Sequence, residues 1–144
     1  MRRSAALLAL VLSPALALAD TPPAGEMVPS LGTPISAEEF EAHVAGKTVT
    51  YHQHGLLFGI EEYLPDRKVR WSVTADTCQY GVWYPSGQDI CFVYEDDPKP
   101  ACWTFWLKDG ALVALSTEAA PGQELYETSA DSTPLPCPGP DIGV

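Results

Sequence analysis

From residue 47 onward the chain is divided into short segments in which apolar and polar residues alternate. A period of two is typical of β-strands, whose successive side chains point to opposite faces of a sheet. The clearest case is Val69, Trp71 and Val73, which share one face. The expected strands are residues 47–51, 59–64, 69–73, 81–84, 90–94, 101–107, 111–115 and 124–128.

Turn-forming residues separate these segments. Asp109-Gly110 stands between two apolar runs, which is one of the strongest short signals for a β-hairpin. Consecutive strands joined by tight turns form an antiparallel meander, and a meander of eight strands can close into a barrel that leaves no exposed sheet edge. We therefore predict a mainly β fold, an antiparallel eight-strand meander closed into a small barrel. A β-sandwich is the alternative.

One short helix is expected before the strands. Ser36 is a favourable N-cap and Glu39, three residues later, completes a capping box. Phe40 and Val44 are four residues apart and share one face, and Gly46 ends the helix. A helix of about ten residues is not stable alone in water. We therefore expect the Phe40/Val44 face to dock on the barrel, over one open end or one face.

The N-terminus has the pattern of an export signal. Two arginines precede an apolar run, and the small-x-small sequence Ala17-Leu18-Ala19 follows. The run is shorter than the roughly 20 residues that span a bilayer, so no membrane anchor is expected. We predict a signal peptide over residues 1–19, a proline-rich flexible linker over 20–35 and a single barrel domain over 36–144, located in the periplasm or secreted.

The charge balance narrows the choice of partners. Eight basic and 19 acidic residues give a net charge of −11, and loss of Arg2 and Arg3 with the signal peptide makes it about −13. An acidic surface repels phosphate backbones, so no nucleic-acid partner is expected. The oligomeric state is left open by the sequence.

An even number of cysteines in a small exported domain predicts disulfides. The four are Cys78, Cys91, Cys102 and Cys137, and their spacings do not match common zinc modules. Three connectivities are possible. Strand alternation places Cys91 and Cys102 on one outward face, and a hairpin turning at residues 96–97 sets them opposite each other. This register favours Cys91–Cys102, which leaves Cys78–Cys137.

Several short motifs together resemble a known group of proteins. They are the helix start at residues 36–39, Gly81-Val82-Trp83, Ile90-Cys91, Cys102-Trp103 and Asp109-Gly110. In this order they resemble small exported bacterial proteins of a domain-of-unknown-function family with a lipocalin-like, barrel-like β architecture. The resemblance covers roughly residues 36–113. It implies a fold and a compartment but no activity and no site residues.

His52 and His54 are the sharpest candidate for metal binding. Side chains two apart on a strand point the same way and can share one ion. Val49 and Tyr51 look like the inward set, however, so the two histidines are expected to face solvent. A third ligand would have to come from Glu61 or Glu62. A metal site is therefore kept as an alternative to a polar outer face.

No catalytic residues are assigned and no cofactor is expected. Adjacent glutamates on a strand point to opposite faces, so Glu61 and Glu62 cannot share a substrate, and an inward Glu62 would need Arg70 or Lys68 as a partner. No serine or cysteine stands in a recognisable nucleophile motif. We therefore do not expect an enzyme.

The aromatic residues suggest a binding role or a filled core. Barrel interiors of this size are either packed with side chains or hold one small ligand. Trp106 is expected to point outward as an exposed contact residue. Because the inward residues are mostly large, filling is expected in the middle, and any pocket is expected beside the helix. The candidate ligand-binding residues are Phe40, Val44, Trp71, Trp83, Trp103 and Phe105.

These observations favour a non-enzymatic barrel module that binds a small apolar ligand or an envelope protein. The alternatives are a structural or accessory envelope protein whose barrel is filled, and a metal-binding protein that uses His52 and His54.

Overall fold

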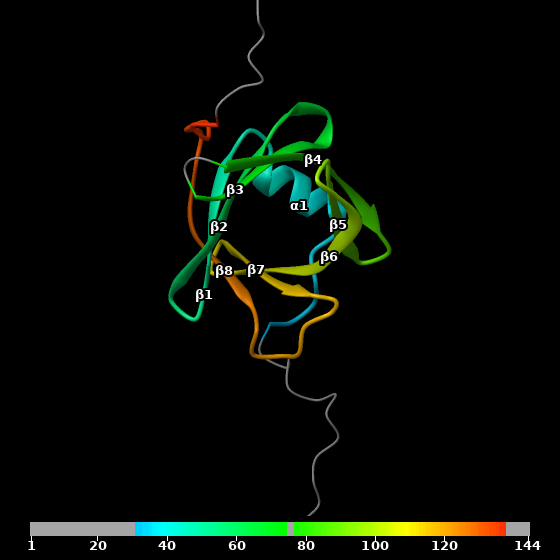
Figure 1. Ribbon diagram of the computed structural model, residues 1–144. Helices are drawn as coiled ribbons and strands as arrows, with labels where there is room; N and C mark the ends of the chain where they lie inside the picture. The colour runs from blue at the N-terminus through cyan, green and yellow to red at the C-terminus, as the bar shows by residue number, and fades with distance from the viewer. Residues whose placement is uncertain (1–30, 75–76, 138–144) are drawn as a thin grey trace, which may run out of the picture.

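The computed structural model describes residues 31–74 and 77–137, which form one closed antiparallel barrel (Figure 1). Eight strands follow one another around the barrel in chain order, and β1 pairs with β8 to close it. The strands are β1 (Thr48–Gln53), β2 (Leu56–Tyr63), β3 (Lys68–Thr74), β4 (Thr77–Ser86), β5 (Asp89–Tyr94), β6 (Asp97–Lys108), β7 (Ala111–Ser116) and β8 (Leu125–Asp131). The predicted eight-strand barrel is therefore confirmed, and the sandwich alternative is wrong.

Two-residue hairpin turns set the register at both ends of the barrel. Asp109 and Gly110 have φ angles of 53° and 81°, and His54 and Gly55 have φ angles of 50° and 78°. Two successive positive φ angles define the turn whose twist matches antiparallel strands. The Asp-Gly turn was predicted. The His-Gly turn was not predicted, and it ends β1 before His54.

The helix α1 (Ala37–Val44) closes one end of the barrel. The Ser36 hydroxyl accepts from the Glu39 amide, and the Glu39 carboxylate accepts from the Ser36 amide, so the predicted capping box is present. Phe40 and Val44 are fully buried. The Phe40 ring contacts four aromatic rings of the barrel interior, those of Tyr63, Trp83, Phe92 and Phe105. A 3-10 turn, η1 (Pro65–Arg67), joins β2 to β3.

Both predicted disulfides are present. Cys91 and Cys102 are direct partners on β5 and β6, with 4.0 Å between their Cα atoms. The other bridge joins Cys78 on β4 to Cys137 in the tail after β8. The β5–β6 turn lies at residues 95–96, one residue earlier than expected. A register shift between Phe92 and Tyr94 restores the expected pairing.

Two segments outside the barrel cover parts of its outer surface. The described part of the expected linker, residues 31–35, runs along β6, where the Ile35 amide donates to the Phe105 carbonyl and the Trp106 indole donates to the Gly32 carbonyl. Trp106 points outward as predicted, but only 7% of it is exposed. The expectation of an exposed tryptophan is therefore wrong, because this segment covers the ring. On the other side, the Leu135 amide donates to Glu62 on β2.

None of the helices in the described part of the chain combines the length and the apolar character needed to cross a membrane. The predicted signal peptide, residues 1–19, lies outside the described residues.

Candidate ligand-binding cavity

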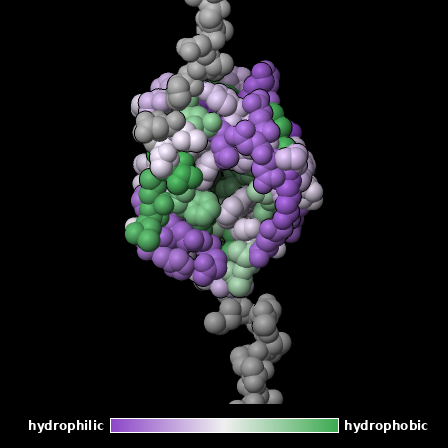
Figure 2. Space-filling model, viewed as in Figure 1, coloured by the Kyte–Doolittle hydropathy of each residue, from purple (hydrophilic) through white to green (hydrophobic). Residues whose placement is uncertain are grey.

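The barrel contains a cavity of about 350 Å³ at the end away from the helix. Figure 2 shows the face of the molecule hollowed at its centre. The inner part of the lining is buried, whereas Val73 and Ala101 are exposed and form part of the mouth. The lining residues are Tyr51, Phe58, Glu61, Tyr63, Trp71, Val73, Phe92, Tyr94, Ala101, Trp103, Phe105, Ala114 and Leu125.

Small inward residues create this space. Ala101 is the direct neighbour of Phe92, and Ala114 is the direct neighbour of Phe105. Gly59 lies under the Trp71 indole so closely that a Cβ atom built on it would be 2.1 Å from the ring. Glycine at position 59 therefore lets the Trp71 indole approach the backbone of β2.

The structure separates the candidate ligand-binding residues into two groups. Trp71, Trp103 and Phe105 line the cavity. Phe40, Val44 and Trp83 do not line it but pack together at the helix end. The expectation that the main pocket lies beside the helix is therefore wrong.

The reason for this difference is that Phe40 inserts among the barrel rings and fills the end where a pocket was expected. A smaller depression of about 190 Å³ does lie beside Val44, between the helix and η1. Arg67 crosses that depression, with its guanidinium 4.7 Å from the centre of the Trp83 ring and bound to Glu41.

Glu61 is the acidic residue of the cavity lining. It is a direct neighbour of Trp71 across the β2–β3 pair, and only 2% of it is exposed. Its Oε2 accepts a hydrogen bond of 2.9 Å from the Tyr94 hydroxyl, whereas Oε1 is buried with no hydrogen-bond partner among the described residues. Burial raises the pKa of Glu61 from 4.5 to about 8, and the Tyr94 hydrogen bond offsets part of this effect. At neutral pH the carboxyl is therefore mostly protonated.

Glu62, its neighbour in the chain, has the opposite environment. Glu62 points to the outer face, where it forms an ion pair of 2.7 Å with Arg70 and accepts from the Leu135 amide. Arg70 or Lys68 was expected to pair with Glu62 if Glu62 pointed inward. Arg70 does pair with it, but on the outer face of the barrel. The barrel therefore leaves the inward glutamate, Glu61, without a basic partner among the described residues that line the cavity.

Tyrosine hydroxyls supply the other polar groups of the lining. The hydroxyls of Tyr51 and Tyr63 lie 2.9 Å apart and hydrogen-bond to each other. Burial is the largest cause that raises the pKa of Tyr51, Tyr63 and Tyr94 above the ordinary value of 10. All three hydroxyls therefore stay protonated at physiological pH and can donate hydrogen bonds.

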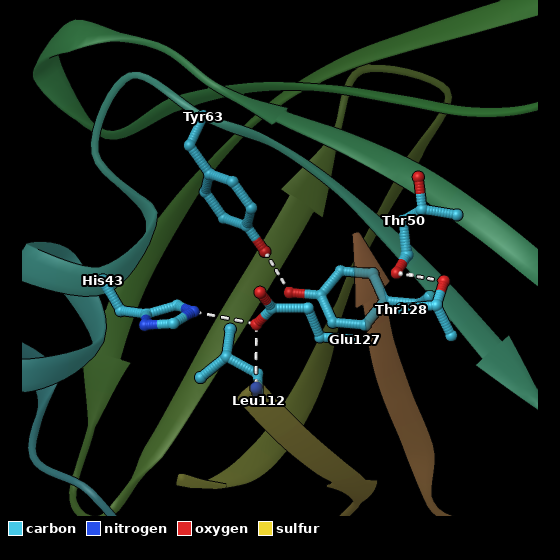
Figure 3. Close-up of polar contacts among 7 residues, drawn as sticks. His43, Thr50, Tyr63, Leu112, Glu127 and Thr128 are labelled. Carbon is cyan, nitrogen blue, oxygen red and sulfur yellow. Dashed lines mark hydrogen bonds and ion pairs between the residues drawn. The ribbon is translucent and has the colours of Figure 1, made fainter. Parts of the chain in front are cut away.

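A second, partly buried polar cluster ties the helix to the barrel (Figure 3). His43 on α1 lies 2.8 Å from Oε2 of Glu127 on β8, and the same oxygen accepts from the Leu112 amide on β7. Figure 3 shows Tyr63 pointing toward this cluster from β2. Because each of these groups has a partner, the cluster serves to fix the helix on the barrel.

The two histidines of the candidate metal site do not converge with acidic residues. His52, on β1, lies 2.8 Å from the Thr128 hydroxyl, whereas His54 lies in the hairpin turn, 3.5 Å from the side chain of Gln123. The two histidines do not lie on one strand as expected, because β1 ends at Gln53. In residues 31–74 and 77–137 no group of three histidine, cysteine or acidic side chains could hold a metal ion.

Sequence reasoning considered Glu61 as a third metal ligand and, with Glu62, as a rejected catalytic pair, and it missed the place of Glu61 in the cavity. The alternation Gly59, Glu61, Tyr63, read together with the inward Tyr51, was the signal that could have found it. Tyr51 pairs directly with Gly59, which puts all four residues on the inner face.

Comparison of the chain with protein-family models, with curated proteins and with solved structures found no match. The resemblance to small exported bacterial proteins of a domain-of-unknown-function family therefore stays a prediction.

Proposed function

We propose that this protein is an exported, non-enzymatic barrel that binds one small, largely apolar ligand in its cavity. The observation that carries this proposal is the cavity of about 350 Å³ in the barrel, lined by aromatic rings. Ligand pockets are typically about 300–1,000 Å³ and mostly apolar, with a few polar groups that orient the ligand. The volume is at the lower end of that range, which favours a ligand of one or two rings or a short chain.

The chemistry of the lining supports binding rather than catalysis. Among the described lining residues, the polar side-chain groups are the Glu61 carboxyl and three tyrosine hydroxyls, apart from the two indole N–H groups. The remaining side chains are aromatic or aliphatic. Such a wall stabilises a bound apolar group by removing its surface from water, at about 25 cal/mol per Å².

The proposed compartment rests on two observations. Two disulfides suit an oxidising environment outside the cytoplasm, and the first 19 residues have the pattern of a signal peptide. The exported protein is expected to begin at Asp20. Intact-mass measurement of protein recovered from the periplasm or the medium tests this, and retention of Met1 would contradict export by cleavage.

The binding proposal is tested with 2-methylnaphthalene, an apolar probe without a hydrogen-bonding group. Calorimetric titration of the wild-type protein should show binding at one site. Ala101→Phe, which places a ring at the mouth, should weaken binding by about tenfold or more, because filling a pocket excludes its ligand. Val82→Phe is the matched control, since Val82 is exposed on the outer face of β4.

Two results would count against ligand binding. Wild-type protein that shows no binding would favour the accessory envelope protein, acting through its outer surface. Binding that Ala101→Phe leaves unchanged would place the probe elsewhere on the protein.

A further inference from the structure

The buried carboxyl of Glu61 carries an inference about the ligand, and this inference rests on the binding function proposed above. One of its oxygens has no hydrogen-bond partner among the described residues. Leaving a buried polar atom unpaired costs about 1–3 kcal/mol. A wall position that needed only bulk would be filled at lower cost by leucine or methionine. An acid at this position is therefore best explained by a ligand that pairs with it.

The charges around the cavity select the kind of ligand. The described lining residues contain one acid and no lysine, arginine or histidine, and Arg70 is held on the outer face by Glu62. The whole chain carries a net charge of −11. A carboxylate or phosphate ligand would find no basic partner in the cavity and would be repelled by the net charge of the protein, so it is disfavoured. A cation is attracted by the same field.

The aromatic wall adds a second preference for a cation. Phe58 lies 5.8 Å from Trp71 and 5.9 Å from Trp103, measured between ring centres, so three rings form one continuous surface in the cavity. Ring faces attract ammonium groups, with tryptophan the strongest. The same surface packs against hydrocarbon. One wall can therefore hold both parts of an apolar amine.

We propose that the cavity binds a small apolar amine, with the ammonium group paired to the Glu61 carboxylate and the hydrocarbon part packed on the rings of Phe58, Trp71 and Trp103. Oε1 is buried, so the ammonium group reaches it only after a lining side chain shifts, as side chains commonly do on binding. The total charge is the same before and after the amine binds. The amine enters as a cation, Glu61 releases its proton to the solvent, and an ion pair remains in the cavity.

Three probes of the same shape test this proposal: 2-naphthylmethylamine, 2-naphthylmethanol and 2-methylnaphthalene. Calorimetric titration of the wild-type protein at pH 7 should show the amine binding about tenfold or more tightly than either neutral probe, because a charge-assisted hydrogen bond is roughly twice as strong as a neutral one. Glu61→Gln should abolish this preference, so that the amine binds no more tightly than the two neutral probes.

The matched control is Glu95→Gln, which makes the same carboxyl-to-amide change at an exposed turn residue and should keep the preference. A measurement on the wild-type protein alone gives independent evidence. Titrations in two buffers of different ionisation enthalpy report proton release, which should be close to one proton per amine and none per alcohol.

The outcomes separate this inference from the proposed function. Equal affinities for the amine and the alcohol, a preference that survives Glu61→Gln, or amine binding without proton release would each overturn the amine assignment, while binding of 2-methylnaphthalene in the cavity would still stand. Absence of binding by all three probes would overturn both.

Discussion

The ring centre of Phe40 on the helix lies 4.6 Å from that of Phe105 on β6, and this contact places a helix side chain inside the barrel. Phe40 has no exposed surface, and its ring also touches Tyr63, Trp83 and Phe92. A helix of eight residues has little stability of its own. Its position therefore depends on its contacts with the barrel, and Phe40 supplies the aromatic ones.

Phe40→Ala should lower the free energy of unfolding by about 3–5 kcal/mol, the usual cost of removing a buried phenylalanine. Urea unfolding monitored by tryptophan fluorescence measures the change. Glu38→Ala, an exposed position on the same helix, is the control and should change it by less than about 1 kcal/mol. A small effect of Phe40→Ala would mean that the helix is not needed to hold the barrel together.

The two disulfides should differ in what they contribute to stability. The bridge between Cys78 and Cys137 joins residues 59 apart, whereas that between Cys91 and Cys102 joins residues 11 apart. On the chain-entropy argument a longer closed loop stabilises more, about 4 kcal/mol against about 3 kcal/mol. Unfolding of the two double Cys→Ser variants in urea tests this order. The reverse order would show that native packing, rather than loop length, decides the effect.

The contact between Gly59 and the Trp71 indole predicts a coupled pair of substitutions. Gly59→Ala places a methyl group where the ring lies and should destabilise the protein by about 1–3 kcal/mol, the usual cost of overpacking. Gly59→Ala in a Trp71→Leu background should cost much less, because the ring is gone. A double-mutant cycle in urea measures this coupling. Equal costs in both backgrounds would contradict a direct clash.

Most of the fold could be predicted because each strand carries its own signal. The alternation of residues in Val69–Val73 and the Asp109-Gly110 turn are local, and eight such segments joined by short turns leave few topologies. The disulfide between Cys91 and Cys102 was predicted although the turn was placed one residue late. A register shift in the hairpin compensated for that error, and nothing in the local sequence marks it.

The position of the cavity could not be predicted from the sequence, for a different reason. Which end of a barrel is filled depends on where the helix docks, and a capped helix with an apolar face does not specify its docking site. The choice between Glu61 and Glu62 as the inward residue depends on the register of β2 against β1, in which Glu61 pairs with the inward Val49. A one-residue slip exchanges the two faces of a strand. The candidate site therefore follows from pairing across strands.

The buried carboxyl should also make the stability of the protein depend on pH. Burial raises the pKa of Glu61 to about 8 from an ordinary value of 4.5. The groups that face it are the hydroxyls of Tyr94, Tyr51 and Tyr63, with Glu127 close to Tyr51. Burial also raises the pKa of these tyrosines above 10, so they stay protonated between about pH 4.5 and pH 8, where Glu61 titrates.

The sign follows from which state keeps the proton. Below about pH 4.5 Glu61 is protonated in both states; between about 4.5 and 8 the folded protein keeps a proton that the unfolded chain releases; above about 8 both have lost it. The free energy of unfolding should therefore fall as pH rises through this window, on the order of 1 kcal/mol per pH unit.

Urea unfolding of wild type and Glu61→Gln between about pH 5 and pH 8 isolates this contribution, because other groups titrate alike in both proteins. The wild type should lose stability relative to the variant as pH rises, while Glu95→Gln should follow the wild type. Parallel curves for wild type and Glu61→Gln would show that the carboxyl ionises as readily in the barrel as in the unfolded chain.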